Sequence, residues 1–174
     1  MSIFASTPSK CAETREARVS VCSVKTLLQR VHYANVRVDN EIVGEIQRGL
    51  VAFVGVEVGD TQADAHMTAR KIAGLRVFPG ATPMDKSVVE VGGGVLVISQ
   101  FTLAGKVSKG RRPSFNRAEA PERATALYEL VAKNLEDQGI PIATGVFGAH
   151  MDIEMLHDGP VSLRIETEAG VIVS

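Results

Sequence analysis

The residues best suited to chemistry stand where an apolar stretch ends: Ser99, Gln100 and Thr102 follow the run from Val95 to Ile98. Two hydroxyl groups and an amide are unusual there, because polar groups at the end of a buried strand cost free energy unless something pairs with them. They either hydrogen-bond to a neighbouring strand or surround a reacting carbonyl group. In the second arrangement, the Gln100 amide and backbone N–H groups would stabilise an oxyanion.

Conventional hydrolase signatures are missing from the chain. It has no G-x-S-x-G nucleophile elbow, no H-E-x-x-H zinc motif and no glycine-rich loop before Lys-Ser/Thr for a nucleotide phosphate. A search for a Ser-His-Asp or Cys-His set therefore fails. The histidines match no metal-binding spacing and are interpreted as surface or hydrogen-bonded side chains; they are His32, His66, His150 and His157.

Two other features could carry function. Gly159-Pro160 precedes the last predicted strand and, taken alone, indicates a simple turn. A basic cluster lies in the polar loop after the Ser99 region, where Gly110 and Pro113 restrain the shape of the chain. The cluster is either a solvated loop or a patch that contacts phosphates, and its members are Lys106, Lys109, Arg111, Arg112 and Arg117.

The elements that position these residues begin with strands. Alternating apolar and polar residues predict a strand over 27–39, and the turn pair Asp39-Asn40 predicts a hairpin into 41–49. Residues 50–59 form a continuous apolar and β-branched run, which is typical of a central strand covered on both faces. The remaining predicted strands cover residues 95–102, 142–153 and 161–166.

Two helices are expected on one side of this sheet. Asp60-Thr61 offers an N-cap to the first, whose apolar residues recur at helical intervals as far as residue 75. The second has Pro121 in its first turn and ends at Gly139 and Pro141. The expected fold is therefore α+β: a single-domain mixed, largely antiparallel, barrel-like sheet with two main helices packed on it.

Length and composition limit the classes of function. The 174 residues suffice for one domain, and 45% hydrophobic and 22% charged residues are ordinary globular usage. No apolar run approaches the roughly 20 residues needed to cross a bilayer, so a membrane-spanning role is not expected. The formal net charge of −1 gives no overall attraction to nucleic acid, so any RNA must be met by a local patch.

Residues 1–23 are rich in small, polar and charged residues and are predicted to be a poorly ordered extension of a domain that spans 24–174. They lack the continuous apolar stretch of a secretory signal. The chain's two cysteines, Cys11 and Cys22, lie here. Two thiols cannot form a zinc quartet, and a disulfide between them would tie only this segment. A cytoplasmic location is expected.

Taken together, these pieces resemble the bacterial and eukaryotic D-aminoacyl-tRNA deacylase family over about residues 25–166. The set is specific because several motifs recur in the family's order. The matching segments are LQRV at 28–31, VGEI at 43–46, GL and VGVE within 49–57, SQFTL at 99–103, KGRRPSF at 109–115, TG and FGAHM within 144–151, and DGPVS at 158–162.

The resemblance implies a hydrolase that cleaves the ester bond of D-aminoacyl-tRNA, without metal or cofactor, as a chiral proofreading step in translation. It implies a homodimer with both active sites at the subunit interface. Each site is built from SQFTL of one chain and completed by Gly159-Pro160 of the other, as a cis peptide. The carbonyl groups of this pair would exclude an L-aminoacyl side chain. Glycyl-tRNA, including glycine mischarged on tRNA for alanine, would be accepted.

Within the site, the resemblance places the ester carbonyl against the backbone N–H of Phe101 and against Thr102, with Gln100 shaping the pocket. Thr102 is either a nucleophile or a positioning group. Positioning is favoured, with the tRNA's terminal 2′-hydroxyl assisting a water, because no general base is visible nearby. The other implied substrate-binding residues are Ser99, Phe147, Met151, Gly159, Pro160 and Ser162, and the tRNA-binding ones are Lys109, Arg111 and Arg112.

The chain departs from the family pattern at two places. Asn-x-Gly-Pro-x-Thr is usual in the last motif, where this chain has His157 and Ser162. Both retain hydrogen-bonding groups, but His157 brings a charge that depends on pH. After SQFTL, Ala104-Gly105 replaces a common aromatic-acidic pair, which alters the outer wall of the pocket.

Two other classes of function remain open from the sequence. One is a nucleic-acid-binding protein that kept the fold and lost the activity; the joint presence of SQFTL and Gly159-Pro160 argues against it. The other is a hydrolase of small esters or D-amino-acid peptides, which would need a conventional nucleophile and base. Free D-amino acid esters compared with D-aminoacyl-tRNA would separate this class from a deacylase.

Overall fold

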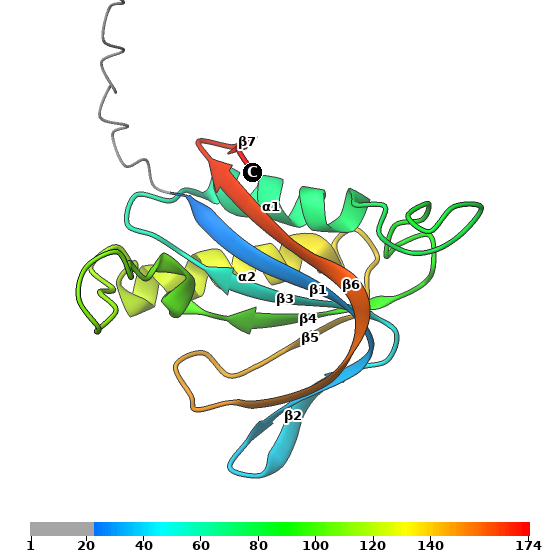
Figure 1. The fold of residues 1–174 in the computed structure, drawn as a ribbon, viewed down its shortest axis with the longest axis horizontal. Coiled ribbons are helices and arrows are strands. Elements are labelled where there is room, and N and C mark those ends of the chain that lie inside the picture. Colours follow the sequence, from blue (N-terminus) through cyan, green and yellow to red (C-terminus); the bar gives the residue numbers. More distant parts are fainter. Residues whose placement is uncertain (1–22) are drawn as a thin grey trace, which may run out of the picture.

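The structure, a computed structural model, describes residues 23–174. The extension predicted for residues 1–23 therefore lies, except for Ser23, outside the described residues, and so do both cysteines. Figure 1 shows the elements in the order β1 (Val24–Val38), β2 (Glu41–Ile46), β3 (Gly49–Gly55), α1 (Gln62–Gly74), β4 (Gly94–Ser99), the 3-10 helix η1 (Phe101–Ala104), α2 (Pro121–Glu136), β5 (Ile142–Thr144), β6 (Asp152–Glu168) and β7 (Val171–Ile172).

The strands of the described chain form one mixed sheet in the order β5-β4-β3-β1-β6-β7, with β2 paired to β1. The β3–β4 and β4–β5 pairs are parallel and the others are antiparallel. The sheet curls until β2 approaches β5, where a Cβ atom on Gly44 would lie 2.5 Å from the carbonyl oxygen of Thr144. The predicted mixed, largely antiparallel and barrel-like sheet is thus present as a half-barrel (Figure 1).

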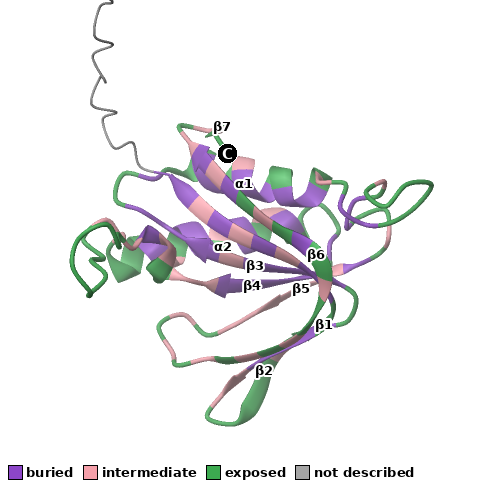
Figure 2. Cartoon of the chain, in the orientation of Figure 1, coloured by how far each residue is buried: buried purple, intermediate pink, exposed green. Residues whose placement is uncertain are grey.

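Both helices cover the same face of the sheet, as predicted. The larger apolar cluster joins α1 and α2 to inward residues of the strands, for example Ile72, Leu135 and Leu50. A smaller cluster on the opposite, concave face contains strand residues such as Val51 and Leu96. Figure 2 shows that burial is concentrated in the central strands, whereas much of β2 and of the loop before α2 is exposed.

The helix ends follow the predicted signals. Thr61 caps α1 through a capping box, in which its backbone N–H donates to the Asp64 carboxylate at 2.9 Å. Pro121 begins α2, and Gly139 follows it with a φ of 80°, the left-handed conformation that glycine adopts without strain. The caps and apolar faces were therefore sufficient to place both helices.

Four predicted strand boundaries were wrong. The central strand ends at Gly55, and the strand expected over 95–102 ends at Ser99. The stretch 142–153 holds the short β5, a loop and only the first two residues of β6, because Gly145 and Gly148 interrupt it, the latter with a φ of 76°. The last long strand begins at residue 152, so Gly159-Pro160 lies inside β6 and is no turn before it.

No helix in residues 23–174 is both long enough and apolar enough to cross a membrane.

Candidate active site

The end of β4 forms the first half of the candidate site. Gln100 leaves the sheet, and its backbone N–H donates to the Val54 carbonyl at 2.8 Å before the chain turns into η1. Gly55 permits this turn: a Cβ there would lie 2.8 Å from the Gln100 oxygen and 2.9 Å from the Cβ of Leu103. Phe101 and Thr102 therefore lie on a helical turn and not on the strand predicted for them.

This turn presents hydrogen-bond donors. Phe101 and Thr102 occupy the first turn of η1, where backbone N–H groups have no intrahelical acceptor. The Gln100 side-chain amide donates to the Thr102 hydroxyl, and this contact holds both side chains beside those N–H groups. The arrangement is chemically suited to binding a carbonyl oxygen that becomes negatively charged.

A cavity of about 600 Å³ opens beside this turn. It brings together five of the predicted site residues, which come from β4, η1 and the loop after β5: Ser99, Gln100, Phe101, Phe147 and Met151. Its walls are mostly apolar side chains, as is usual for a small-molecule site. The size and lining suit a small organic ligand.

Tyr128 lines the same cavity, although its place among the apolar residues of α2 marks it in the sequence only as a core residue. Its hydroxyl donates to the Val97 carbonyl at 2.8 Å, and its ring lies 6.0 Å from that of Phe147. Burial raises the pKa of Tyr128 to about 12, so the hydroxyl stays protonated near neutral pH. Tyr128 therefore acts as a neutral wall of the cavity. Helical spacing could place it on the buried face but could not show that this face borders a cavity.

Gly159-Pro160 forms the second half and lies elsewhere. The peptide bond between them is cis. Residues 158–161 bulge out of β6, because Ser162 pairs with Gln29 and His157 already pairs with Val31. Gly159 and Pro160 are both exposed on this bulge.

The two halves lie far apart in one chain. Through its pairing with Val54 in β3, Ser99 lies at the register of Thr26 in β1. The bulge lies opposite Arg30, which is four residues further along β1, or about 13 Å at the usual rise per residue. Strands β3 and β1 separate β4 from β6, which adds about 14 Å across the sheet. Figure 1 shows the bend of β6 at the opposite end of the sheet from the tip of β4. The cavity and the Gly-Pro bulge of one chain do not meet.

Buried and half-buried polar groups hold the bulge. Arg30 is 7% exposed; its Nε lies 2.8 Å from the Asp158 carboxylate, and its Nη1 donates to the Val77 carbonyl. His157 Nε2 lies 3.0 Å from the Val161 carbonyl oxygen and 3.4 Å from the Ser162 hydroxyl. The two departures from the family pattern, at His157 and Ser162, therefore contact each other across the bulge.

The basic loop forms a small hairpin near the cavity. Lys106 and Ser114 exchange backbone hydrogen bonds of 2.8 and 3.0 Å, and Gly110 stands near its tip with a φ of 68°. Lys109, Arg111 and Arg112 are all exposed on it (Figure 2). None of these three lines the cavity, so the structure gives them a place beside it only.

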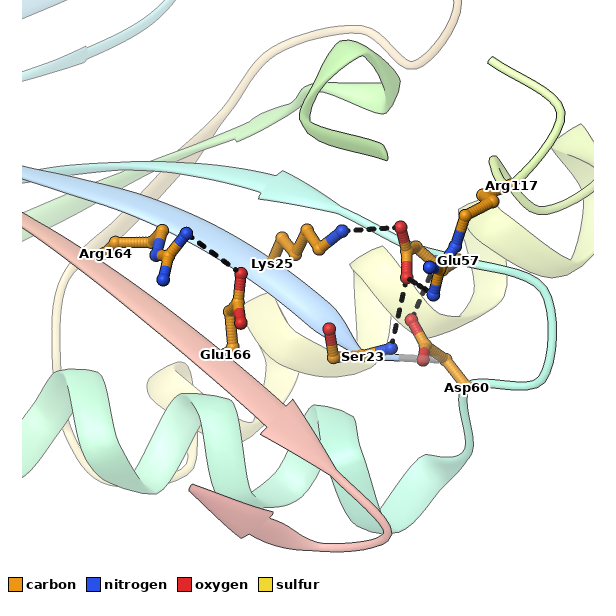
Figure 3. A network of polar contacts seen from close by, with 7 residues as sticks. All are labelled: Ser23, Lys25, Glu57, Asp60, Arg117, Arg164 and Glu166. Atoms are coloured by element: carbon orange, nitrogen blue, oxygen red, sulfur yellow. Dashed lines mark hydrogen bonds and ion pairs between the residues drawn. The ribbon is translucent and has the colours of Figure 1, made fainter. Parts of the chain in front are cut away.

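Arg117, the last member of the basic cluster, takes part in a buried network (Figure 3). The Glu57 carboxylate is fully buried and lies 2.6 Å from both Lys25 Nζ and Arg117 Nη2. The Glu57 N–H donates to Asp60 at 2.7 Å. Burial is the main cause that raises the pKa of Asp60 to about 7, and the charges of Asp64 and Glu57 add to it. This network ties the end of the basic loop to the body.

The network was missed because its members are distant in sequence. Glu57 stands at the end of an apolar run, which alone predicts only the end of a strand. Residues 23–174 contain no group of three or more His, Cys, Asp or Glu side chains placed to bind a metal ion.

Comparison with known proteins adds the family. The family described as D-Tyr-tRNA(Tyr) deacylase matches residues 27–166. D-aminoacyl-tRNA deacylase of Geobacter metallireducens is 48% identical over 145 residues, which cover 83% of this chain and 96% of that protein. The enzyme of Halalkalibacterium halodurans is also 48% identical and is covered completely, against 83% of this chain.

A solved structure shares the fold. The protein described as c-Myc DNA Unwinding Element Binding Protein is 36% identical, with a TM-score of 0.79 over 83% of this chain and 99% of its own. The match to the family runs through most of the chain, and the bacterial enzymes are covered over nearly their whole length. The chain belongs to the D-aminoacyl-tRNA deacylase family and is a hydrolase of that type.

Proposed function

We propose that two copies of the chain form a homodimer, in which the cavity of each is completed by Gly159-Pro160 of the other, and that this site hydrolyses the ester of D-aminoacyl-tRNA. The observation that carries the proposal is the separation of the two halves within one chain. An interface is available, because β2, β6 and the loop after β5 expose the apolar side chains of Ile42, Val43, Val146 and Leu156.

In the proposed mechanism, the ester carbonyl oxygen accepts hydrogen bonds from the N–H groups of Phe101 and Thr102. A water attacks the carbonyl carbon, assisted by the 2′-hydroxyl of the terminal ribose. The bond between that carbon and the 3′ ribose oxygen breaks, and the ribose oxygen takes a proton. Thr102 positions substrate, because its side-chain partner is the Gln100 amide, which is no base. Phe147 and Met151 face the terminal adenosine.

In the proposed site, steric exclusion distinguishes D-aminoacyl from L-aminoacyl groups. The exposed Gly159-Pro160 bulge would place its carbonyl groups against the α-carbon of the substrate and leave no room for an L side chain. Ser162 supports this bulge through its contacts with Gln29, at 3.0 Å, and with His157. Glycine carries no side chain to exclude, so glycyl-tRNA, including glycine mischarged on tRNA for alanine, should also be a substrate.

The tRNA body is proposed to meet the basic hairpin, where Lys109, Arg111 and Arg112 supply exposed cations for phosphates. Because the net charge of the chain is −1, this local patch must provide the attraction. A substrate of this kind places the activity in the cytoplasm, where aminoacyl-tRNA is used for translation.

The experiment is release of radiolabelled amino acid from D-tyrosyl-, L-tyrosyl- and glycyl-tRNA by the purified chain treated with a chelator. We expect rapid release from the D-tyrosyl and glycyl substrates, with L-tyrosyl-tRNA spared. Release that stops with the chelator would overturn the metal-independent mechanism, and equal release of L-tyrosine would overturn exclusion by the bulge. Free D-tyrosine ethyl ester in the same assay tests for a general esterase.

A nucleic-acid-binding role is the second candidate, because one relative at 36% identity is described as a DNA-binding protein. A folded, dimeric chain that releases nothing from any of the three substrates, yet binds tRNA or DNA, would favour this role over the deacylase.

A further inference from the structure

Two phenylalanine rings stand together at the mouth of the cavity. Phe101 is 59% exposed and Phe115 is 36% exposed, and their rings meet edge to face with centroids 5.1 Å apart. The chain has only six phenylalanines and two tyrosines, so an exposed pair is a large share of its aromatic surface. Phe101 also lines the cavity, so the pair continues the cavity wall outward.

The surroundings hold Phe115 in place. Its ring covers Gly105, where a Cβ would lie 2.9 Å from the nearest ring atom. The isolated bridge between Lys106 and Ser114 ends directly before Phe115, whose carbonyl accepts the Ala118 N–H at 2.9 Å. Arg117 then fixes the following chain to buried Glu57 at 2.6 Å. An exposed aromatic ring held this firmly is prepared to bind something flat at low entropic cost.

The charges beside the rings indicate what that is. Lys106, Lys109, Arg111 and Arg112 are exposed on the hairpin that leads into Phe115. Within residues 23–174, no ion pair engages any of these four. Aromatic faces next to unpaired cations match single-stranded nucleic acid, whose bases stack while its phosphates meet the cations. An apolar protein partner would leave these cations unused.

We infer that Phe115, supported by Phe101, is a stacking platform for an unpaired base of the tRNA 3′ end, next to the terminal adenosine. The inference rests on the proposed function, which puts the terminal adenosine and its aminoacyl group inside the cavity. The preceding nucleotide then leaves the cavity past Phe101 and meets the exposed ring of Phe115. The cations of the hairpin lie where the phosphates of that strand continue.

The first test compares two substrates, D-tyrosyl-tRNA and the D-tyrosyl ester of adenosine, which lacks every upstream nucleotide. Phe115→Leu should lower kcat/KM for D-tyrosyl-tRNA at least about fivefold, which is the lower end of the effect of losing the stacking of one base. It should change kcat/KM for D-tyrosyl-adenosine less than about twofold. Phe115→Tyr, which keeps the ring, should behave as the wild type on both.

Equal losses on both substrates would overturn the inference, because they would show that the ring shapes the cavity. Absence of a loss on D-tyrosyl-tRNA would overturn it as well. Failure of the proposed function looks different, since the unchanged protein would then hydrolyse neither substrate. Met84→Ala, which removes an exposed apolar side chain from the loop after α1, is the matched control and should leave both rates unchanged.

A second test leaves the protein unaltered and therefore does not depend on how a variant folds. The wild-type chain is given D-tyrosyl-tRNA in which the penultimate nucleotide keeps its sugar and phosphate but lacks its base. We expect kcat/KM to fall about tenfold for this RNA and Phe115→Leu to add little further loss. Hydrolysis at the normal rate would show that no base stacks there.

Discussion

The two ends of the curled sheet have opposite shapes: a cavity lies at the end of β4, and an exposed bulge projects from β6. At the β4 end, the chain turns away from the sheet and leaves a cavity bordered by N–H groups, a hydroxyl and an amide. At the β6 end, four residues bulge outward and leave Gly159-Pro160 exposed. Each end is held by an ion pair with one buried partner, Glu57 with Arg117 at one and Arg30 with Asp158 at the other.

In the proposed function, the β4 end binds the substrate and the β6 end excludes the L side chain. A cavity needs walls, so the β4 end draws on several elements that are distant in sequence. A protrusion needs only a rigid base, which β1 supplies to β6 on both sides of the bulge. If the cavity and the bulge meet only between two chains, substitutions in the bulge should remove activity although no residue that lines the cavity is changed.

Gly159→Leu should have the largest effect on activity of the substitutions that distinguish the bulge from the cavity. In its own chain a Cβ at Gly159 meets only the His157 ring, at 3.9 Å, so stability should change little. In the proposed dimer the leucine would enter the partner's cavity and displace the substrate. We expect kcat/KM for D-tyrosyl-tRNA to fall at least about a hundredfold, with an unchanged Tm. Full activity would show that the bulge faces no cavity.

Mixing two inactive variants tests whether a complete site combines the cavity of one chain with the bulge of another. Gly159→Leu keeps an intact cavity, and Thr102→Arg, which replaces the hydroxyl bonded to Gln100 with a long charged side chain, keeps an intact bulge. Equal amounts, unfolded and refolded together, should regain activity at about a quarter of all sites, because one site in each mixed dimer is complete. Each variant refolded alone is the control, and no recovery would contradict a shared site.

Thr102→Val probes the β4 end alone. The substitution keeps the volume but removes the hydroxyl that accepts the Gln100 amide hydrogen bond. We expect kcat to fall about tenfold, the effect of one lost hydrogen bond, if Thr102 positions the substrate as proposed. Thr102→Ser should retain most of the rate. Complete loss in the valine variant would indicate a nucleophile.

Arg111→Ala combined with Arg112→Ala separates attraction of the tRNA from the chemistry at either end. Both side chains are exposed outside the cavity, so kcat should stay the same while KM rises several-fold. The slope of log affinity against log salt should fall by about 1 for each phosphate contact that is lost. A lower kcat with an unchanged salt slope would contradict this role.

Asp60→Asn tests the scaffold behind the β4 end. Because the folded pKa of Asp60, about 7, exceeds its ordinary 3.8, the folded state holds a proton that the unfolded state has released, and stability falls as pH rises between these values. Asparagine cannot ionise. The difference in free energy of unfolding between the two proteins should therefore change by roughly 2 to 4 kcal/mol from about pH 4 to about pH 8, in favour of the variant at high pH; the upper value is the full shift and the lower one allows for screening by solvent. A constant difference would contradict the shift.

Much of this architecture could be predicted from local patterns. Caps and apolar periodicity placed both helices, because signals such as Thr61 and Pro121 act within a few residues. Strand ends failed where long-range pairing decides them. Gly159-Pro160 reads as a turn in sequence, yet β1 continues to pair with β6 on both sides of it. The two residues of β7 pair with the end of β6, and no pattern announces so short a strand.

Some features of the candidate site could likewise be predicted from local sequence, and others depend on contacts between distant residues. The motif SQFTL could be found in the sequence, and the cavity gathers Ser99, Gln100 and Phe101. Tyr128 and the Glu57 network could not be assigned, because a buried hydroxyl or carboxylate is defined by partners that lie far along the chain. The separation of the cavity from the bulge is likewise a property of sheet order, which local patterns do not encode.

In the proposed dimer, that separation makes the rate of hydrolysis depend on the concentration of the chain. A lone chain carries both halves and no complete site, so its turnover should vanish on dilution below the dissociation constant of the dimer. At such concentrations the observed rate should rise with the square of the amount of protein and become linear only when pairs dominate. The cell would then control this activity through how much of the chain it makes, more steeply than in simple proportion.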